Sequence, residues 1–144
     1  MPQADSCIFC SVVKSPADDE KNFVLHRGAH AFVILNLYPY ISGHLMVAPY
    51  AHLGELDAAP REATSEMMEL VKRCQTALRE VYSPQGFNVG MNLGRAGGAG
   101  IPDHIHMHIM PRWVGDTNFM TSVAETRVLP EDLTTTYRKL LARF

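Results

Sequence analysis

The sequence predicts an α+β fold, with a mainly antiparallel sheet of about five strands, one long helix and a short C-terminal helix. Two observations indicate this class: short apolar segments separated by turn residues, and one long segment with helical periodicity. The 144 residues suit one domain, and no repeat or linker divides them. We therefore expect residues 1–144 to form a single domain.

Five short apolar segments are expected to be strands. They are rich in β-branched, aromatic and aliphatic residues, and Gly, Pro, Asn or Ser residues lie between them. The expected strands are 22–26, 30–35, 44–48, 87–92 and 104–110. Residues 115–129 follow neither periodicity and are expected to be irregular.

The long helix is expected over 60–82, where apolar residues recur at steps of three and four. This stripe comprises Ala63, Met67, Leu70, Val71, Cys74, Leu78 and Val81. Pro60 suits the first turn of a helix, and Ser83-Pro84 ends it. Cys74 is expected to be a small buried hydrophobe. A short second helix is expected to begin near Pro130.

Composition and charge exclude several classes of function. Thirteen Lys and Arg against fifteen Asp and Glu give a net charge of −2, without the basic patch of a nucleic-acid binder. No apolar run approaches the roughly 20 residues of a membrane span, and the N-terminus lacks the pattern of a signal peptide. We therefore expect a cytoplasmic protein that binds neither nucleic acid nor a membrane.

Histidine alternates with apolar residues from position 104 to 109. In a strand this places His104, His106 and His108 on one open face, roughly 6.6 Å apart, while the residues between them pack on the helix. Chance clustering explains such strict alternation poorly. Two interpretations remain: a metal site, because histidine is the commonest metal ligand, or an imidazole that attacks phosphorus, because its pKa near 6.5 leaves it largely neutral.

The histidine segment, with Pro-Arg-Trp after it, resembles the signature of the histidine triad (HIT) superfamily. Further segments that match its bacterial members are 35–36, 42–49, 90–94, 111–113 and the pair Cys7-x-x-Cys10. The likeness covers about 7–113, which would be the core. The tail over 114–144 resembles bacterial proteins related to diadenosine tetraphosphate phosphorylases. The resemblance implies a HIT-like fold and a homodimer whose sheet continues across both copies.

The resemblance also implies catalytic roles. His106 would be the nucleophile, forming a nucleotidyl-histidine intermediate that water or phosphate resolves. His108 would contact the α-phosphate and the bridging oxygen, and His44 would help to fix the phosphates. His104 would orient His106. The implied function is a hydrolase or phosphorylase acting on diadenosine polyphosphates or adenylylated compounds.

The same resemblance implies contacts to a purine nucleotide or dinucleotide. Asn36 matches a position near the ribose, and Asn92 matches a polar position near the phosphates. Phe32, Ile34 and Leu35 would shape an apolar slot for the base.

One position departs from the family pattern. Many relatives carry Ser, Thr or Gln three or four residues before the motif, where this chain has Gly100 and Ile101. Backbone N–H groups around Gly98 and Gly100 would replace that donor, because glycine lets the main chain approach an anion closely. The competing interpretation is a plain hairpin connection over 94–100.

Cys7 and Cys10 have the spacing of half a tetrahedral zinc site. Three cysteines without a secretory signal make disulfides a poor expectation. His52 is a candidate third ligand, and the resemblance implies His104 as the fourth, in a structural zinc site. An unmetallated thiol pair and a redox disulfide are the alternatives.

Other functions compete with the covalent enzyme. One is a non-catalytic purine-nucleotide-binding module on the same fold, and another is a nucleoside phosphoramidate hydrolase. The intact His44, His106 and His108 favour an enzyme, because a binding module needs no nucleophile. A zinc enzyme that uses the three histidines as ligands would need a nearby carboxylate base, and Asp103 is the available one. Hydrolysis and phosphorolysis are both compatible with these residues.

Overall fold

The computed structural model describes residues 6–37, 42–116 and 131–144. Its helices are α1 (Ile8–Val13), α2 (Arg61–Tyr82) and α4 (Leu133–Leu141), with short 3-10 turns η2 (Pro16–Asp18) and η3 (Leu56–Ala58). Its strands are β1 (Val24–Arg27), β2 (Ala31–Leu35), β3 (Leu45–Pro49), β4 (Gly86–Met91) and β5 (Met107–Arg112). No described helix is long and apolar enough to cross a membrane.

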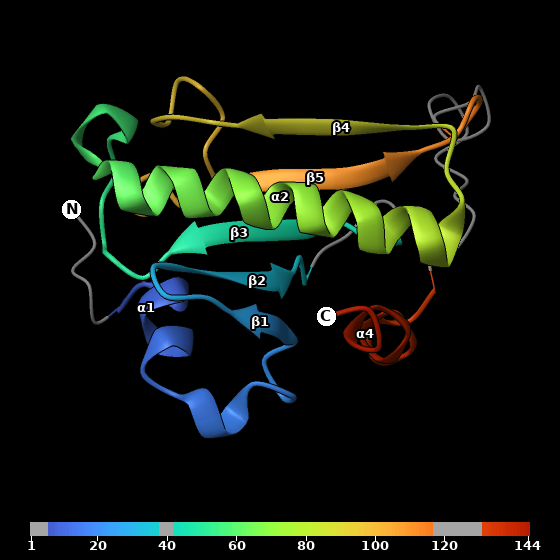
Figure 1. Ribbon diagram of the computed structural model, residues 1–144. Coiled ribbons are helices and arrows are strands. Elements are labelled where there is room, and N and C mark those ends of the chain that lie inside the picture. Colours follow the sequence, from blue (N-terminus) through green and yellow to red (C-terminus); the bar gives the residue numbers. More distant parts are fainter. Residues whose placement is uncertain (1–5, 38–41, 117–130) are drawn as a thin grey trace.

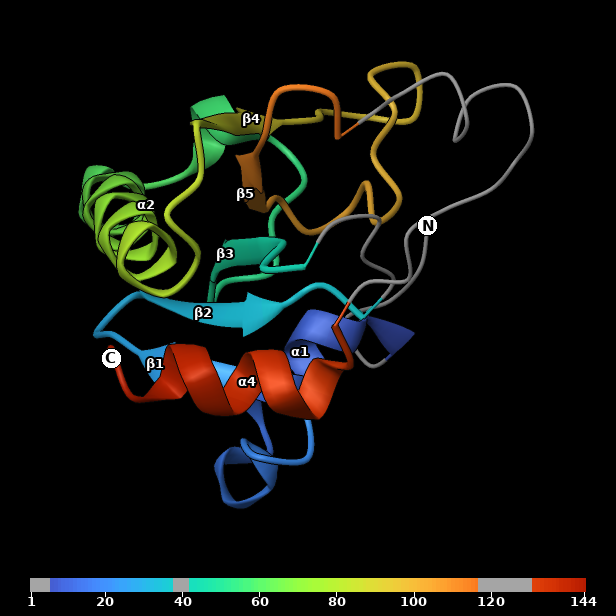
Figure 2. The ribbon, with the colours of Figure 1, turned by 90° about the vertical axis from the view of Figure 1, so that its right-hand side faces the viewer.

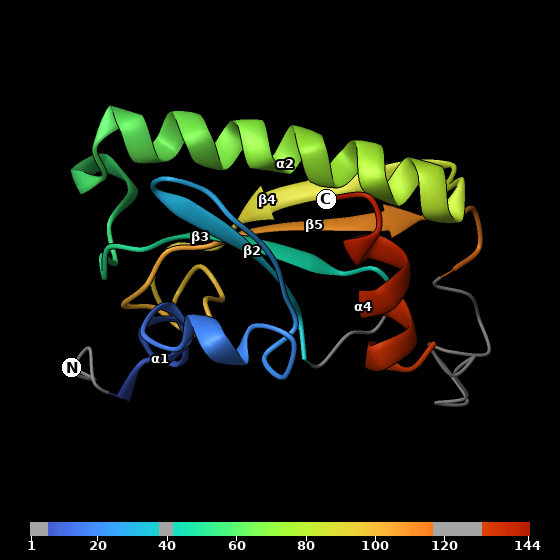
Figure 3. The ribbon, with the colours of Figure 1, turned by 60° about the horizontal axis from the view of Figure 1, so that its bottom comes forward.

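The described strands form one antiparallel sheet in the order β1-β2-β3-β5-β4. The long helix α2 lies along one face of this sheet (Figure 1). The short helix α1 lies on the opposite face, as the tilted view makes clear (Figure 3). The last strand in sequence, β5, is therefore internal to the sheet, between β3 and β4.

The two faces of the sheet carry two separate apolar clusters. On the α2 face, the helical stripe packs on alternate strand residues such as Val33, Leu45, Val47 and Ile109. On the α1 face, Phe9 packs with residues of the opposite alternation, among them Phe32 and Ile34. Burying one such side chain contributes roughly 1.5–3 kcal/mol, so both faces stabilise the sheet.

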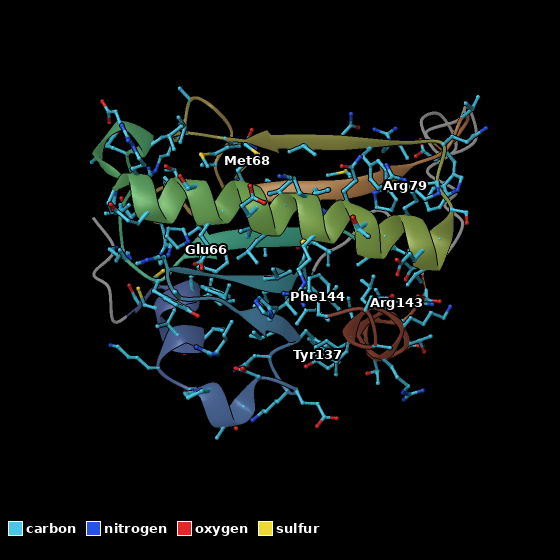
Figure 4. The ribbon with its side chains drawn as sticks, viewed as in Figure 1. Glu66, Met68, Arg79, Tyr137, Arg143 and Phe144 are labelled. Atoms are coloured by element: carbon cyan, nitrogen blue, oxygen red, sulfur yellow. The ribbon has the colours of Figure 1, made fainter. Side chains whose placement is uncertain are left out.

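The C-terminal helix α4 packs beside β1 and against α2 (Figure 2). Tyr137 reaches from α4 toward β1 and donates its hydroxyl proton to the carbonyl oxygen of Val24 at 2.8 Å (Figure 4). Leu140 is completely buried in the α2-side core. Asp132 accepts a hydrogen bond from the Thr135 N–H at 3.0 Å and caps the helix.

The predicted α+β class, the five strands and the long helix are confirmed. The helix begins at Arg61 after Pro60, and it ends where Ser83 adopts a left-handed conformation with φ of 47°. Cys74 is fully buried, as predicted, and burial raises its pKa to about 12. The predicted short helix begins at Leu133.

Two predictions about elements were incomplete or wrong. The strand predicted over 104–110 begins only at Met107. Pro49 of β3 has no N–H to continue the ladder, and the Ile105 N–H donates to the Leu53 carbonyl oxygen instead, at 2.7 Å. Helix α1 was not predicted, because six residues are too few for a periodic signal. Most of the stretch predicted to be irregular, 115–129, lies outside the described residues.

Candidate active site

A row of side chains crosses the sheet on its α1 face through His108. The strand register aligns Ile34, Met46, His108 and Gly90. Since alternation places every second residue of a strand on the same face, Met110 lies on this face as well. The Asn36 N–H donates to the His44 carbonyl oxygen at 2.9 Å, so these two residues lie together just beyond the paired ends of β2 and β3.

His106 precedes β5 and is buried, with 5% of its surface exposed. Its Nδ1 lies 3.0 Å from the carbonyl oxygen of His104, so the Nδ1 proton is donated to that oxygen. This hydrogen bond fixes the tautomer in which Nε2 carries the lone pair. Burial lowers the pKa of His106, which keeps the imidazole neutral. The ring is held between Phe9 and His108, with centroid distances of 5.0 and 4.9 Å.

His44 and His108 form a second imidazole pair. Nε2 of His44 lies 2.9 Å from Nδ1 of His108. The Asn36 amide nitrogen lies 3.1 Å from Nδ1 of His44. Burial, followed by the neighbouring His108 and His106, lowers the pKa of His44 to about 4. Burial, followed by the neighbouring His106, also lowers the pKa of His108, so both rings are neutral at neutral pH.

An open groove of about 480 Å³ lies beside this pair. Its lining comprises His44, Asn88, Val89, Gly90, Met91, Asn92, His108 and Met110. The groove therefore places the predicted residue Asn92 near His44 and His108. Gly90 pairs with His108 in register, and no protein atom lies within 4 Å of the position where a Cβ would stand.

The prediction that all three alternating histidines line an open surface was wrong. His104 is completely buried and His106 nearly so, whereas His108 is partly exposed at the groove. The reason is α1, which covers one end of the row: the Phe9 ring lies 5.2 Å from that of His104 and 5.0 Å from that of His106.

The four predicted metal ligands come together under α1. One ligand atom each of Cys7, Cys10, His52 and His104 lies within 4.8 Å of all the others. The Nδ1 atom of His104 lies 3.4 Å from Cys7 Sγ, and the Nδ1 atom of His52 lies 3.3 Å from Cys10 Sγ.

The protonation pattern of His104 also suits a metal. Its Nε2 donates to the carbonyl oxygen of Pro49 at 2.8 Å, which leaves the Nδ1 lone pair facing the two sulfur atoms. An outer carbonyl partner of this kind orients metal-binding histidines generally. Two thiols and two imidazoles are the donor set of a structural zinc site, so these residues fit zinc.

Other predicted contact residues are not brought together. Leu35 packs in the α2-side core, on the opposite face from the histidines, because it is one residue out of phase with Ile34. The proposed role of Leu35 in a base slot is therefore wrong. Phe32 and Ile34 lie on the correct face, but both are buried in the cluster that Phe9 completes.

The glycine-rich loop also differs from the prediction. The Gly98 N–H already donates to the Arg95 carbonyl oxygen at 2.9 Å, and the Ala99 N–H donates to the Gly94 oxygen at 3.1 Å. Neither Gly98 nor Gly100 lines the groove. The loop is therefore a turn held by its own backbone hydrogen bonds. The predicted contact between the Gly98 N–H and an anion is wrong, because that N–H already has a partner within the loop.

Sequence reasoning missed Phe9, Asn88 and Met110. Phe9 lies between Cys7 and Cys10 in the sequence. That position could have indicated that its side chain packs near the histidines. Met110 follows His108 by two residues, and Asn88 precedes Gly90 by two, so strand alternation places both with their partners on the groove face.

The chain matches known proteins in sequence and in fold. A sequence profile of the HIT domain matches residues 18–114. The chain is 42% identical over 124 residues to an AP-4-A phosphorylase of Mycobacterium tuberculosis, covering 86% of this chain but only 63% of that relative's length. It is 30% identical over 135 residues to adenosine 5'-monophosphoramidase hnt1 of Schizosaccharomyces pombe, covering 89% of this chain and 96% of that protein.

The fold is also similar to that of a solved relative. The crystal structure of a zinc-bound histidine triad family protein from Mycobacterium smegmatis superposes with a TM-score of 0.77 at 28% identity. The match covers 98% of this chain and 94% of that one. The profile match, the sequence relatives and the shared architecture lead to one conclusion: the chain belongs to the histidine triad (HIT) family.

Proposed function

We propose that this chain is a nucleotide hydrolase or phosphorylase that cleaves the α-phosphate linkage of diadenosine polyphosphates or adenylylated compounds. The observation that carries the proposal is the hydrogen bond from His106 Nδ1 to the His104 carbonyl oxygen. It leaves His106 with a lone pair on Nε2, in a neutral ring, which is the form that attacks phosphorus.

The neighbouring polar groups fix a hydrogen-bond donor for the leaving group. An amide N–H of Asn36 donates to His44 Nδ1, so the proton of neutral His44 is on Nε2 and is donated to His108 Nδ1. Neutral His108 then carries its own proton on Nε2. An N–H at that atom is suited to donating a hydrogen bond to the leaving group, because His108 is partly exposed at the groove.

The reaction then proceeds in two balanced steps. His106 Nε2 forms a bond to the α-phosphorus while the bond to the bridging atom breaks, and the departing atom accepts a hydrogen bond from the His108 Nε2–H, which stabilises the charge that develops on it. Water or inorganic phosphate next attacks the phosphorus, the P–N bond to His106 breaks and restores the neutral imidazole, and the proton of the attacking group is released to solvent. Water gives a nucleoside monophosphate and phosphate gives a nucleoside diphosphate.

We assign a structural role to zinc. Cys7, Cys10, His52 and His104 would hold it, and the ion would supply a rigid tie between the N-terminal segment and the residues before β5. No proton or electron transfer is assigned to this site. Its contribution to catalysis is indirect, because the backbone carbonyl of His104 orients the nucleophile.

The relatives support two substrate classes. The phosphorylase of Mycobacterium tuberculosis is named for a dinucleoside polyphosphate, although this chain spans only 63% of its length. The monophosphoramidase of Schizosaccharomyces pombe is matched over 96% of its length, which favours phosphoramidates as the second candidate. The two classes share the attack by His106 and differ in whether oxygen or nitrogen leaves.

We also propose a homodimer. Strand β4 is the last strand of the described sheet, and an unpaired strand edge is a ready template for a second strand. Val89 on β4 and Met68 on α2 are each 49% exposed, and Met68 projects on the side of α2 nearest β4 (Figure 4). A second copy would cover these apolar side chains while its sheet continues this one.

The test of the function is turnover of a substrate panel. Diadenosine tetraphosphate with and without inorganic phosphate, and an adenosine phosphoramidate, should be incubated with purified protein and the products separated by chromatography. Cleavage of the dinucleotide to an adenosine nucleotide is expected. Cleavage of the phosphoramidate alone would assign the second substrate class. Tight nucleotide binding without turnover of any compound would contradict the proposal that the chain is an enzyme.

A further inference from the structure

The turn that carries His44 packs directly on the end of α2. Gly43 has a φ of 84°, a conformation that favours glycine. A Cβ at this position would lie 2.9 Å from Leu78 Cδ2 and 3.1 Å from Tyr82 Cε2. The backbone just before His44 is therefore in close contact with the last two turns of the helix.

A second group of contacts reaches the same turn from the C-terminal segment. The Glu131 N–H donates to Ser42 Oγ at 2.8 Å. Oε1 of Glu131 accepts hydrogen bonds from the Tyr82 hydroxyl at 2.7 Å and the Thr136 hydroxyl at 2.8 Å. Oε2 of Glu131 pairs with Lys139. We call Ser42, Tyr82, Glu131, Thr136 and Lys139 the Glu131 cluster.

The protonation states keep this cluster connected. Burial alone would raise the pKa of Glu131, but the hydrogen bonds from Lys139, Tyr82 and Thr136 outweigh it and lower the pKa. Burial, together with the hydrogen bond to Glu131, raises the pKa of Tyr82. At neutral pH the carboxylate is thus an acceptor and the phenol is a donor, as their hydrogen bond requires.

Docking of α4 also rests on contacts outside this cluster. Leu140 is buried in the core, Tyr137 donates to Val24, and the Phe144 carbonyl oxygen accepts from Arg73 at 2.7 Å. These contacts hold the helix against β1 and α2. The hydrogen bond from Glu131 to Ser42 instead holds the turn two residues before His44.

We infer that Ser42 and Glu131 are positioning residues for catalysis, which fix the backbone before His44 and so set its hydrogen bond to His108. The inference rests on the proposed function, in which that hydrogen bond defines the proton on His108. His44 Nε2 and His108 Nδ1 are 2.9 Å apart, and displacement of a catalytic group by about 1 Å can cost 10²-fold in rate.

The test compares a variant in the turn before His44 with a variant at the N-cap of α4. Ser42→Ala removes the acceptor of the Glu131 N–H, whereas Asp132→Ala removes the helix cap and leaves Ser42 in place. We expect Ser42→Ala to lower kcat roughly five- to tenfold with KM changed less than about twofold, the pattern of a lost transition-state contact. The ¹⁵N resonances of His44 and His108 should shift as well. Ser42→Thr, which keeps the hydroxyl, should restore both.

Asp132→Ala should lower the melting temperature but leave kcat and the histidine resonances as in the wild type. Unchanged histidine resonances in Ser42→Ala would overturn the inference. So would equal losses of kcat in Ser42→Ala and Asp132→Ala at equal stability. Absence of turnover in the wild type would instead refute the proposed function, while the resonances of His44 would still decide the positioning role.

Discussion

The two ends of the histidine segment lie in opposite environments. His104 is completely buried between Phe9, the cysteines and Pro49, and it has no exposed surface. His108 is partly exposed, lines an open groove and contacts His44. The two histidines are four residues apart in sequence. His104 belongs to the cluster of predicted metal ligands, whereas His108 belongs to the pair of imidazoles at the groove.

The difference arises because β5 begins only after the first two histidines. From Met107 onward the residues are in the sheet, and the groove beside β4 reaches the side chains of His108 and Met110. Before Met107 the chain lies under α1, whose cysteines and Phe9 contact His104. His106 lies at the boundary, with its Nδ1 fixed by the structural end and its ring against His108 at the chemical end.

The largest effect is expected at this boundary. His106→Ala should reduce turnover by on the order of 10⁴-fold or more, because it removes the attacking atom. Nucleotide affinity should stay within roughly tenfold, or about 1.4 kcal/mol, since the proposed contacts of Asn36 with the ribose and of Asn92 near the phosphates remain in place. Steady-state kinetics and calorimetric titration with a non-cleavable nucleotide measure the two quantities. Near-normal turnover would refute the assignment.

A change at the structural end should affect stability first. Cys7→Ser should lose the roughly one equivalent of zinc expected in the wild type, and the melting temperature should fall by roughly 5–10 °C. Metal analysis and thermal unfolding measure both. Cys74→Ala is the matched control, since Cys74 is buried in the other core and should keep the zinc. Metal-free wild-type protein with an unaltered melting temperature after chelation would exclude the zinc site.

A change at the chemical end should affect turnover and spare the metal. His108→Ala should slow cleavage of a dinucleotide by roughly 10²-fold, the usual range for a lost hydrogen bond to charge that develops in the transition state, with zinc content unchanged. An adenylate ester with a nitrophenyl leaving group, which departs as a stable anion, should recover most of this loss. His106→Ala should gain nothing from that substrate. Equal losses for both substrates in His108→Ala would argue against its contact with the leaving group.

The smallest effect expected is on the pH dependence of stability. The pKa of His44 is about 4 in the folded state and near 6.5 in the unfolded state, so the unfolded chain binds more protons between these values. The free energy of unfolding should therefore fall as the pH decreases from 6.5 toward 4. Urea unfolding at pH 7.5, 6 and 5 should show a smaller decrease for His44→Gln. Parallel curves for both proteins would contradict the pKa shift.

Much of this organisation could be predicted from the sequence. The helical stripe, the strand alternation and the turn residues gave the α+β class, since each reports a periodicity that burial enforces. The spacing of Cys7 and Cys10, with the family resemblance, gave the ligand set that converges under α1. These features depend on local patterns or on motifs with fixed spacing.

The remainder depends on tertiary contacts that no local pattern contains. The environment of His104 depends on α1, which lies far away in sequence. Leu35 is the exception, because strand alternation alone places it on the opposite face from Ile34, and the prediction overlooked this. The hydrogen bond from Glu131 to Ser42 joins residues 89 positions apart and has no sequence signature.

The central claim is that His106 forms a covalent bond to the α-phosphorus. The most direct measurement is rapid quenching of the wild-type enzyme with denaturant at alkaline pH during turnover of a dinucleotide labelled at the α-phosphorus, followed by peptide mapping of the trapped label. The account predicts an acid-labile phosphoramidate on the peptide that contains His106 and no label on His106→Ala. Label on another residue, or label retained by His106→Ala, would contradict it.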